Sequence, residues 1–238
     1  MVGIGPGNPD DRTHRAERAI RRADVIFGYR PYLQAIADIT QDKELRPSGM
    51  RQERERVDAA LDEVMRGKKV ALVSSGDAGI YGMAGVALER SQARQLRIQI
   101  EIVPGVTAAA AAAARFGAPL MLDYATLSLS DLLVPWDRIV HRVRCMAEAD
   151  LVLALYNPRS QKRTAQLTEV REILLQHRAA DTPVGLARAL GSPEEAHSLS
   201  TLGNFDEHEV DMRSILIIGN STTRASDGWM LTPRGYYT

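Results

Sequence analysis

Short apolar runs alternate with longer amphipathic stretches along the first half of the chain. The clearest amphipathic stretch covers residues 52–65, in which Val57, Leu61 and Val64 recur at helical spacing on one face. Such alternation predicts an α/β fold with a mostly parallel sheet. The predicted strands are a short one that begins at Val2, then 25–28, 70–73 and 98–103, and the predicted helices are 11–23, 31–38, 52–65, 80–90 and 107–115.

The second half has a different pattern, because several apolar runs follow one another with only short links between them. Consecutive strands without intervening helices favour a mixed or antiparallel sheet. Ala118-Pro119 breaks the pattern between the halves, so we predict two α/β domains, over residues 1–117 and 118–238. In the second domain the predicted strands are 120–127, 151–156, 183–189, 195–201 and 214–219, and the predicted helices are 137–147 and 164–177.

Composition excludes several classes of protein. Of the 238 residues, 45% are apolar, 25% charged and 5% aromatic, which is ordinary for a globular protein and excludes collagen and wholesale disorder. The 30 basic residues equal the 30 acidic ones, so the basic surplus of a typical nucleic-acid binder is missing and we predict no nucleic-acid partner. Cys145 is the only cysteine, which excludes an internal disulfide and a cysteine-rich zinc site. The five histidines are scattered, so we predict no metal.

The sequence carries no sign of a membrane segment or a secretion signal. Its first twenty residues are glycine-rich and then highly charged, and it has no run of about eighteen apolar residues. We therefore predict a cytoplasmic protein without a membrane partner. The first predicted strand begins almost at Met1, which leaves open whether native residues precede it.

Glycine-containing turns follow the predicted strands of the first half. In open α/β sheets ligands bind beside the carboxyl ends of the strands, and glycines let a ligand approach the backbone closely. Asp77 adds a carboxylate to the Gly76 turn, and Thr107 follows the Gly105 turn at the start of a predicted helix. A purely structural role as helix N-cap explains each of these residues equally well. The turns lie at Gly5, Gly28, Gly76 and Gly105.

The first cluster, Gly3-x-Gly5-Pro6-Gly7, superficially resembles a dinucleotide-binding fingerprint. Its third glycine follows two residues after the second instead of three, and Pro6 removes a backbone N–H that a pyrophosphate would need. A nicotinamide-dependent oxidoreductase therefore stays an alternative that the cluster supports poorly. A tight strand-to-helix turn is the simpler interpretation of the cluster alone.

Taken together, the clusters make the sequence resemble the tetrapyrrole methylase family, the S-adenosylmethionine-dependent enzymes of the cobalamin and sirohaem pathways. The resemblance runs from residue 2 to about residue 220, and within the family it is closest to members that methylate precorrin-3B at carbon 17. The sequence departs from the family at Asn8, where an acidic residue is usual, and at residues 10–12. The matching motifs are Val2-Gly3-Ile4-Gly5-Pro6-Gly7-Asn8-Pro9, Pro47-Ser48-Gly49-Met50-Arg51-Gln52-Glu53, Ser75-Gly76-Asp77-Ala78-Gly79-Ile80-Tyr81-Gly82-Met83, Pro104-Gly105-Val106-Thr107-Ala108, Leu155-Tyr156-Asn157-Pro158-Arg159-Ser160 and Thr182-Pro183-Val184.

The resemblance implies a fold and a cofactor. The fold would be the class III methyltransferase type, two α/β domains with S-adenosylmethionine in the cleft between them, and homodimers are usual in the family. The implied cofactor contacts are Pro6, Ser75, Gly76, Asp77, Ile80, Thr107 and Ala108 in the first domain and Tyr156, Asn157, Ala187 and Arg188 in the second.

The resemblance also implies the activity, methylation of precorrin-3B at carbon 17 with ring contraction in cobalamin biosynthesis. A substrate with many carboxylates needs cationic anchors, because a guanidinium binds a carboxylate through two hydrogen bonds. The substrate-binding candidates are Arg51 first, with Met50 and Arg12 beside it, and Arg30 and Arg159 as weaker ones.

Ring contraction moves protons, so a general acid or base is expected, although an electron-rich substrate carbon could make one dispensable. Three alternatives remain besides the oxidoreductase: a sibling methylase acting at carbon 11 or 20, the anaerobic counterpart with a cobalt-containing substrate, and a non-catalytic binding protein that keeps the fold. The catalytic candidates are Arg51, Glu53, Asp123 and His14, in no order.

Overall fold

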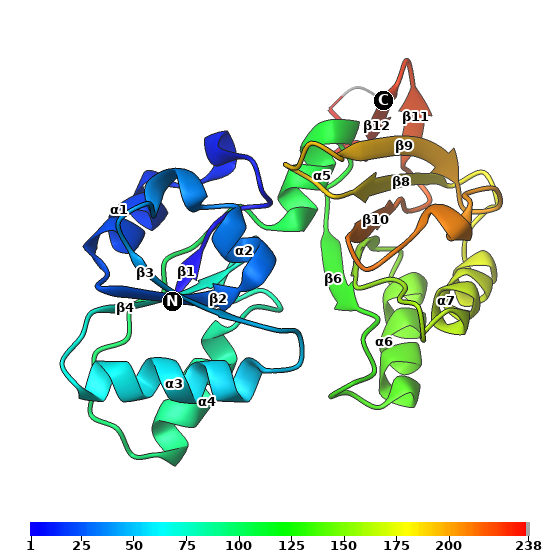
Figure 1. The fold of residues 1–238 in the computed structure, drawn as a ribbon. Helices are drawn as coiled ribbons and strands as arrows, with labels where there is room; N and C mark the ends of the chain where they lie inside the picture. The colour runs from blue at the N-terminus through cyan, green and yellow to red at the C-terminus, as the bar shows by residue number, and fades with distance from the viewer. Residues whose placement is uncertain (237–238) are drawn as a thin grey trace. The chain divides into compact units, whose positions relative to one another are not determined.

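The computed structural model describes residues 1–236, and the chain packs into two compact units that divide after Ala108 (Figure 1). Helix α5 (Ala108–Phe116) lies almost entirely in the second unit. The predicted domain limits, 1–117 and 118–238, differ from this division by about the length of α5. No helix among the described residues is both long and apolar enough to cross a membrane.

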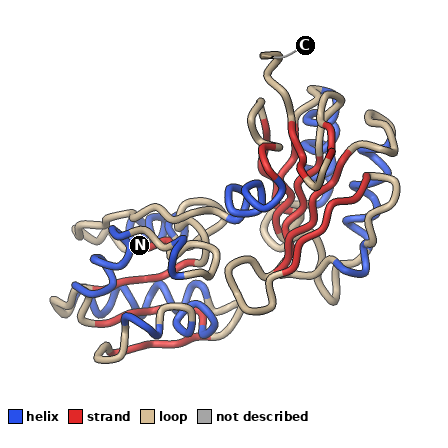
Figure 2. The backbone as a smooth tube through the Cα atoms, turned by 90° about the horizontal axis from the view of Figure 1, so that it is seen from above, coloured by secondary structure: helices blue, strands red, loops and turns tan. Residues whose placement is uncertain are grey.

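The first unit is a parallel sheet in the strand order β1-β4-β2-β3, with helices on both faces (Figure 2). Because side chains alternate along a strand, Ile26 and Val73 pack with helices α1 and α2, while Phe27 and Leu72 pack with α3 and α4. This is the predicted strand–helix alternation. The elements are β1 (Val2–Gly3), α1 (His14–Arg22), β2 (Val25–Tyr29), α2 (Arg30–Gln34), β3 (Glu44–Ser48), α3 (Glu53–Met65), β4 (Val70–Ser74) and α4 (Ala84–Ala93).

The second unit is built on a mixed sheet in the order β6-β7-β10-β8-β9, in which only β6 and β7 run parallel. Leu153, Leu155 and Leu216 pack with helices α6 and α7. A Cβ on Gly185 would lie 2.6 Å from the Phe116 ring, so this glycine lets α5 pack closely on β8. The remaining elements are β5 (Gly117–Ala118), β6 (Tyr124–Ser128), α6 (Trp136–Glu148), β7 (Val152–Tyr156), α7 (Ala165–Leu175), β8 (Pro183–Arg188), β9 (Ala196–Thr201), β10 (Ser214–Ile218), β11 (Arg224–Ser226) and β12 (Trp229–Leu231).

In the first unit, one predicted strand is missing and one predicted helix begins later than predicted. Residues 98–102 form no strand, because β1 beside them is too short to pair with more than Val103, whose N–H donates to the Met1 carbonyl at 2.8 Å. The helix predicted at 80–90 begins only at Ala84, because the preceding amides bond elsewhere: Gly79 to the Asp77 carboxylate and Met83 to the Ser74 hydroxyl.

Three smaller differences concern strand ends and edges. Gly28 does not end its strand, because β2 continues to Tyr29. A Cβ on Gly28 would lie 2.6 Å from the Val73 side chain, so glycine allows close packing at this position. The strand predicted at 120–127 is confined to β6, since residues 119–123 form no regular element. Strand β3 was not predicted, because it is an exposed polar edge strand that contains Pro47, and such strands lack an apolar pattern.

Candidate functional site

The glycine clusters of the first unit come together, backbone against backbone. The N–H of Gly5 donates to the Gly76 carbonyl at 3.1 Å, and the N–H of Gly76 donates back to Gly5 at 2.7 Å. A Cβ on Gly105 would lie 2.1 Å from the Gly76 carbonyl oxygen, and a Cβ on Gly3 would lie 2.7 Å from the Gly105 nitrogen. Gly3 and Gly105 therefore require glycine, because a larger residue at either position would push the loops apart.

Asp77 fastens two of these loops to each other. One carboxylate oxygen accepts from the N–H of Gly79 at 2.7 Å within its own loop, and the other accepts from the N–H of Gly105 at 3.0 Å in the next loop. Hydrogen bonds to an ionised carboxylate are stronger than neutral ones. The side chain is half-buried, so Asp77 both braces the loops and reaches solvent.

The remaining cofactor candidates of the first unit lie on the same loops. Ser75 and Ile80 are exposed, whereas Pro6, Thr107 and Ala108 are half-buried. Ala108 is the first residue of α5, so its N–H has no acceptor within the helix. The loops thus offer small side chains, backbone groups and one exposed apolar side chain, Ile80, which is 40% exposed.

Tyr156 and Asn157 form a second candidate group, at the end of β7 in the second unit. The Tyr156 hydroxyl accepts from the N–H of Ala109 in the first turn of α5 at 2.9 Å. Asn157 adopts a left-handed φ of 49°, and its amide donates to the Ser128 hydroxyl at 2.9 Å. Both side chains are half-buried and held in fixed orientations.

A residue that sequence reasoning missed supports this group. Arg163 is buried, and one of its nitrogens donates to the carbonyls of Asn157 and Leu129, each at 2.8 Å. Burial lowers the pKa of Arg163, and Asp131 at 3.7 Å opposes that shift. Nothing in the local sequence distinguishes Arg163 from a surface arginine, because its partners lie on other segments.

The other two candidates of the second unit differ in accessibility. Ala187 is fully buried in β8, between β10 and β9. Arg188 is exposed at the end of the same strand, with its guanidinium 3.5 Å from the Asp211 carboxylate. Arg188 is therefore the better placed of the two for a ligand contact.

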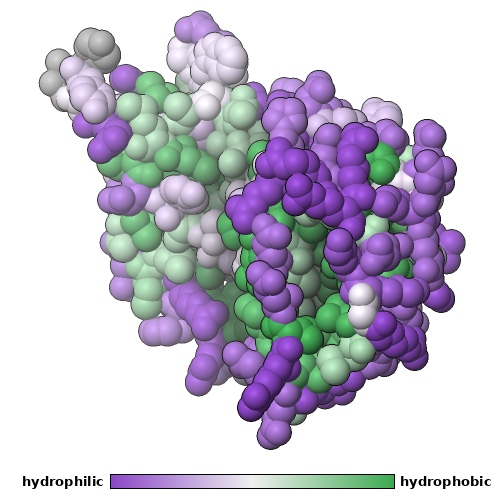
Figure 3. All heavy atoms as spheres, turned by 90° about the vertical axis from the view of Figure 1, so that its left-hand side faces the viewer, coloured by the Kyte–Doolittle hydropathy of each residue, from purple (hydrophilic) through white to green (hydrophobic). Residues whose placement is uncertain are grey.

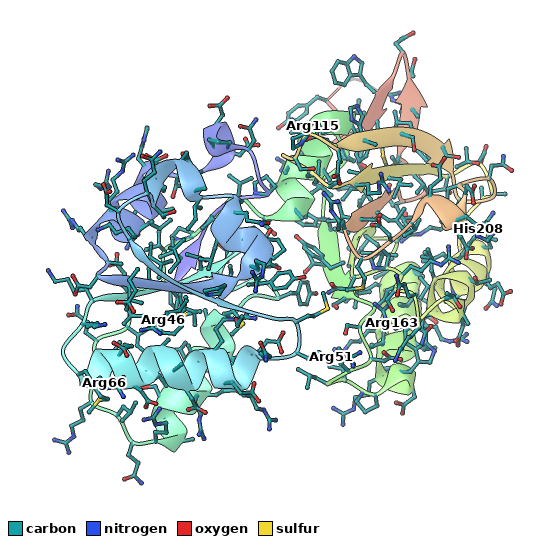
Figure 4. All side chains as sticks on the ribbon, in the orientation of Figure 1. Arg46, Arg51, Arg66, Arg115, Arg163 and His208 are labelled. Atoms are coloured by element: carbon teal, nitrogen blue, oxygen red, sulfur yellow. The ribbon has the colours of Figure 1, made fainter. Side chains whose placement is uncertain are left out.

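Arg51 lies on a well-fixed loop just before α3, where Figure 4 labels it. Its backbone φ is 65°, and its N–H donates to the Glu53 carboxylate at 3.2 Å. The buried Arg56 donates to the Gly49 carbonyl at 2.8 Å and to the Ser48 hydroxyl, which fixes the loop on α3. Among the described residues the Arg51 guanidinium has no partner, so it is available to an anion.

The remaining substrate candidates differ sharply from Arg51. Arg12 is buried and bonds to Asp38, Glu17 and the Ala35 carbonyl. Burial opposes its charge, but the bonds to Asp38 and Glu17 outweigh burial and raise its pKa. Arg12 thus stabilises the fold here, and its geometry argues against substrate binding.

The other candidates are distributed over both units. Met50 is 61% exposed beside Arg51. Glu53 is committed to the Arg51 N–H at the start of α3. Arg159 donates to the Glu207 carbonyl. Asp123, His14 and Arg30 are exposed, and the described residues contain no cluster of side chains arranged to hold a metal.

Known proteins match this chain over most of its length. A family model described as Tetrapyrrole (Corrin/Porphyrin) Methylases matches residues 1–206. A Salmonella typhimurium protein named "Probable cobalt-factor III C(17)-methyltransferase" is 44% identical over 99% of this chain and 98% of its own length. The "Cobalt-factor III methyltransferase" of Priestia megaterium is 40% identical, but this chain spans only 44% of it. The crystal structure of the methyltransferase CobJ matches with a TM-score of 0.92, at 38% identity over 98% of both chains.

Proposed function

This chain belongs to the tetrapyrrole (corrin/porphyrin) methylase family, and we propose that it transfers a methyl group from S-adenosylmethionine to carbon 17 of precorrin-3B, with contraction of the ring. The observation that carries the proposal is the convergence of the Gly5, Gly76 and Gly105 loops at one end of the parallel sheet. These are the loops whose sequences resemble the family, and they follow the carboxyl ends of the strands, where open α/β sheets bind ligands.

The residues of the first unit fit S-adenosylmethionine. Gly76 has a positive φ of 63°, and a Cβ on it would only reach ordinary van der Waals contact at 3.7 Å, so glycine is favoured here by its backbone conformation. The exposed Ile80 offers an apolar surface, and Ala108 offers an N–H without an acceptor in its helix. We assign Pro6, Ser75, Gly76, Asp77, Ile80, Thr107 and Ala108 to the cofactor.

In the second unit, Tyr156, Asn157 and Arg188 are the proposed cofactor contacts. The bonds of Tyr156 to Ala109 and of Asn157 to Ser128 orient these side chains before any ligand binds. Preorganisation of this kind improves affinity by lowering the ordering cost. Ala187 is left out of the proposed contacts because it is fully buried.

The bound cofactor supplies an activated methyl group on a positive sulfur that loses its charge during transfer. The chain's own task is to position the reactants without stabilising that positive charge too strongly, since only interactions stronger in the transition state accelerate a reaction. Asp77 meets this demand, because both of its oxygens already accept hydrogen bonds from backbone amides. The carboxylate thereby holds the loops together. Because the two amides partly compensate its negative charge, it stabilises the positive sulfur less and hinders methyl transfer less.

The substrate is a macrocycle with many carboxylates, and Arg51 is its proposed anchor. The guanidinium is free among the described residues, while Arg56 and Glu53 fix the backbone that carries it. Met50, exposed next to Arg51, offers a flexible apolar surface to the macrocycle. A fixed backbone with a free cation lowers the cost of binding an anionic substrate.

A cobalt-containing substrate is the second candidate, because the 44% identical Salmonella relative is named for cobalt-factor III. The test is parallel incubation of the protein with precorrin-3B or cobalt-factor III and S-adenosylmethionine that carries a carbon-13 methyl group. With only one of the two substrates, we expect the product to gain the mass of one methyl group and the NMR signal of the labelled methyl to show its attachment to carbon 17. Methylation at carbon 11 or 20, or none with either substrate, would refute the proposed function.

A further inference from the structure

A cavity of about 490 Å³ opens in the first unit, away from the glycine loops. Its lining includes Val2 and Val70, the first residues of β1 and β4, whereas the glycine loops follow the other ends of these strands. Figure 3 shows a hollow with a hydrophobic floor and a hydrophilic rim on this side of the molecule. The volume falls within the range of about 300 to 1,000 Å³ that small-molecule sites occupy.

The interior of the cavity is aliphatic. Its walls come from β1, β4, α1, α3 and the irregular segment 98–103. None of the described residues that line it is aromatic, so it offers no ring on which a planar aromatic ligand could stack. An alkyl chain therefore suits it better than a macrocycle. The main apolar lining residues are Val2, Val57, Leu61, Val70, Leu72 and Val103.

The mouth of the cavity is strongly cationic. Of the ionisable side chains that line it, Glu101 is the only acidic one within the described residues, and it pairs with Arg15 at 2.7 Å. Lys68 is neutralised by Glu44 and Glu63, which lie outside the lining.

Three exposed cations remain at the mouth, namely Arg18, Arg22 and Lys69. Within residues 1–236, none of these three side chains forms a hydrogen bond or an ion pair. Arg18 and Arg22 stand four residues apart on α1 and so share one face of the helix. Arg22 also acts electrostatically on the Glu101 carboxylate, which leaves Arg18 and Lys69 as the least compensated of the three cations. An apolar interior below such a group of cations is complementary to a molecule with one alkyl chain and one anionic head.

We propose that this cavity binds a single-chain anionic amphiphile of medium length, with its alkyl chain inside and its head at Arg18, Arg22 and Lys69. The site is separate from the glycine loops and is independent of the proposed methyl transfer. Because burial of each methylene strengthens binding about fourfold, affinity should rise from hexanoate to octanoate to decanoate. The rise should stop when the chain fills the cavity.

The test is calorimetric titration of the full chain with decanoate, decyl phosphate and decyltrimethylammonium, all below their micelle concentrations. We expect saturable binding at one site for at least one anion, and the tighter anion identifies the preferred head. The cation of equal chain length should bind at least about tenfold more weakly. Equal binding of cation and anions, or no binding of either anion, would overturn the proposal.

Two variants locate the site, and a third serves as control. Arg22→Glu should weaken anion binding about fivefold, whereas Arg21→Glu changes the same charge on the same helix but outside the lining and should leave it unchanged. Ala60→Met would partly fill the cavity and should weaken binding of the longest chain most. If Ala60→Met fails to fold, the comparison of anion affinity between Arg22→Glu and Arg21→Glu is sufficient by itself. Equal effects of these two substitutions would contradict the placement of the anionic head at the mouth of the cavity.

Discussion

Removal of the Asp77 carboxylate should weaken cofactor binding, because the loops that it joins would lose their shared hydrogen bonds. Asp77 accepts two backbone hydrogen bonds, at 2.7 Å from Gly79 and at 3.0 Å from Gly105. Bonds to a charged group contribute about 1.5 to 3 kcal/mol each, and the half-buried position favours the lower figure. Together they amount to about 3 kcal/mol, which corresponds to about a hundredfold in affinity if the loops must be reordered on binding.

The assay is calorimetric titration of Asp77→Ala with S-adenosylhomocysteine, combined with hydrogen exchange at the Gly105 amide. We expect about a hundredfold weaker binding and faster exchange at that amide. The affinity of Asp77→Asn should lie between those of the unsubstituted protein and Asp77→Ala, because the amide oxygen of asparagine can accept one of the two hydrogen bonds. Asp42→Ala, which removes an exposed carboxylate of the same unit, is the control. Unchanged affinity and unchanged exchange in Asp77→Ala would refute the reasoning.

Three further variants test other parts of the molecule. Arg51→Ala should weaken tetrapyrrole binding about tenfold and leave S-adenosylhomocysteine affinity unchanged; an equal loss of both, by calorimetry, would instead indicate a folding defect. Gly105→Ala should lower the free energy of unfolding by about 3 kcal/mol in urea, because its Cβ would lie 2.1 Å from the Gly76 carbonyl oxygen; a stable variant would contradict that contact. The Arg115 hydrogen bond lowers the pKa of Glu195, so this pair stabilises the fold above the ordinary carboxyl pKa of 4.5, and the contribution is lost as pH falls through the lowered value. Glu195→Gln should therefore cost about 1.5 kcal/mol at neutral pH and almost nothing in strong acid, and an equal cost at both would argue against the pair.

The meeting of the glycine loops could be predicted from sequence, because the carboxyl ends of neighbouring parallel strands lie at one edge of a sheet. The bracing role of Asp77 could not, since its partner Gly105 is 28 residues away and joins it through a backbone amide. Strand 98–103 was predicted from its apolar residues alone. Whether it forms depends on the neighbouring strand, and β1 has only two residues.

The arginines illustrate the same limit more clearly. Arg12, Arg56 and Arg163 are buried, and each bonds to a segment that is distant in the sequence. Composition counts them with the exposed Arg51, although they have the opposite accessibility. A local sequence pattern predicts which face of a helix is buried. It does not predict which arginine will donate to a carbonyl or a carboxylate on a segment that is distant in the sequence.

This division of the arginines explains how a chain without net charge can offer two separate cationic surfaces. Many of its basic residues form ion pairs within the chain, whereas Arg51 at one place and Arg18, Arg22 and Lys69 at the other form none among the described residues. Both surfaces are proposed anion sites, and charge alone would not determine which anion binds at which site. The apolar neighbour does: Met50 beside Arg51 is exposed and can lie against a wide macrocycle, whereas the aliphatic cavity beside Arg18 admits only a narrow chain. If both proposals hold, selectivity between the two ligands follows from the shape of the apolar surface next to each cation.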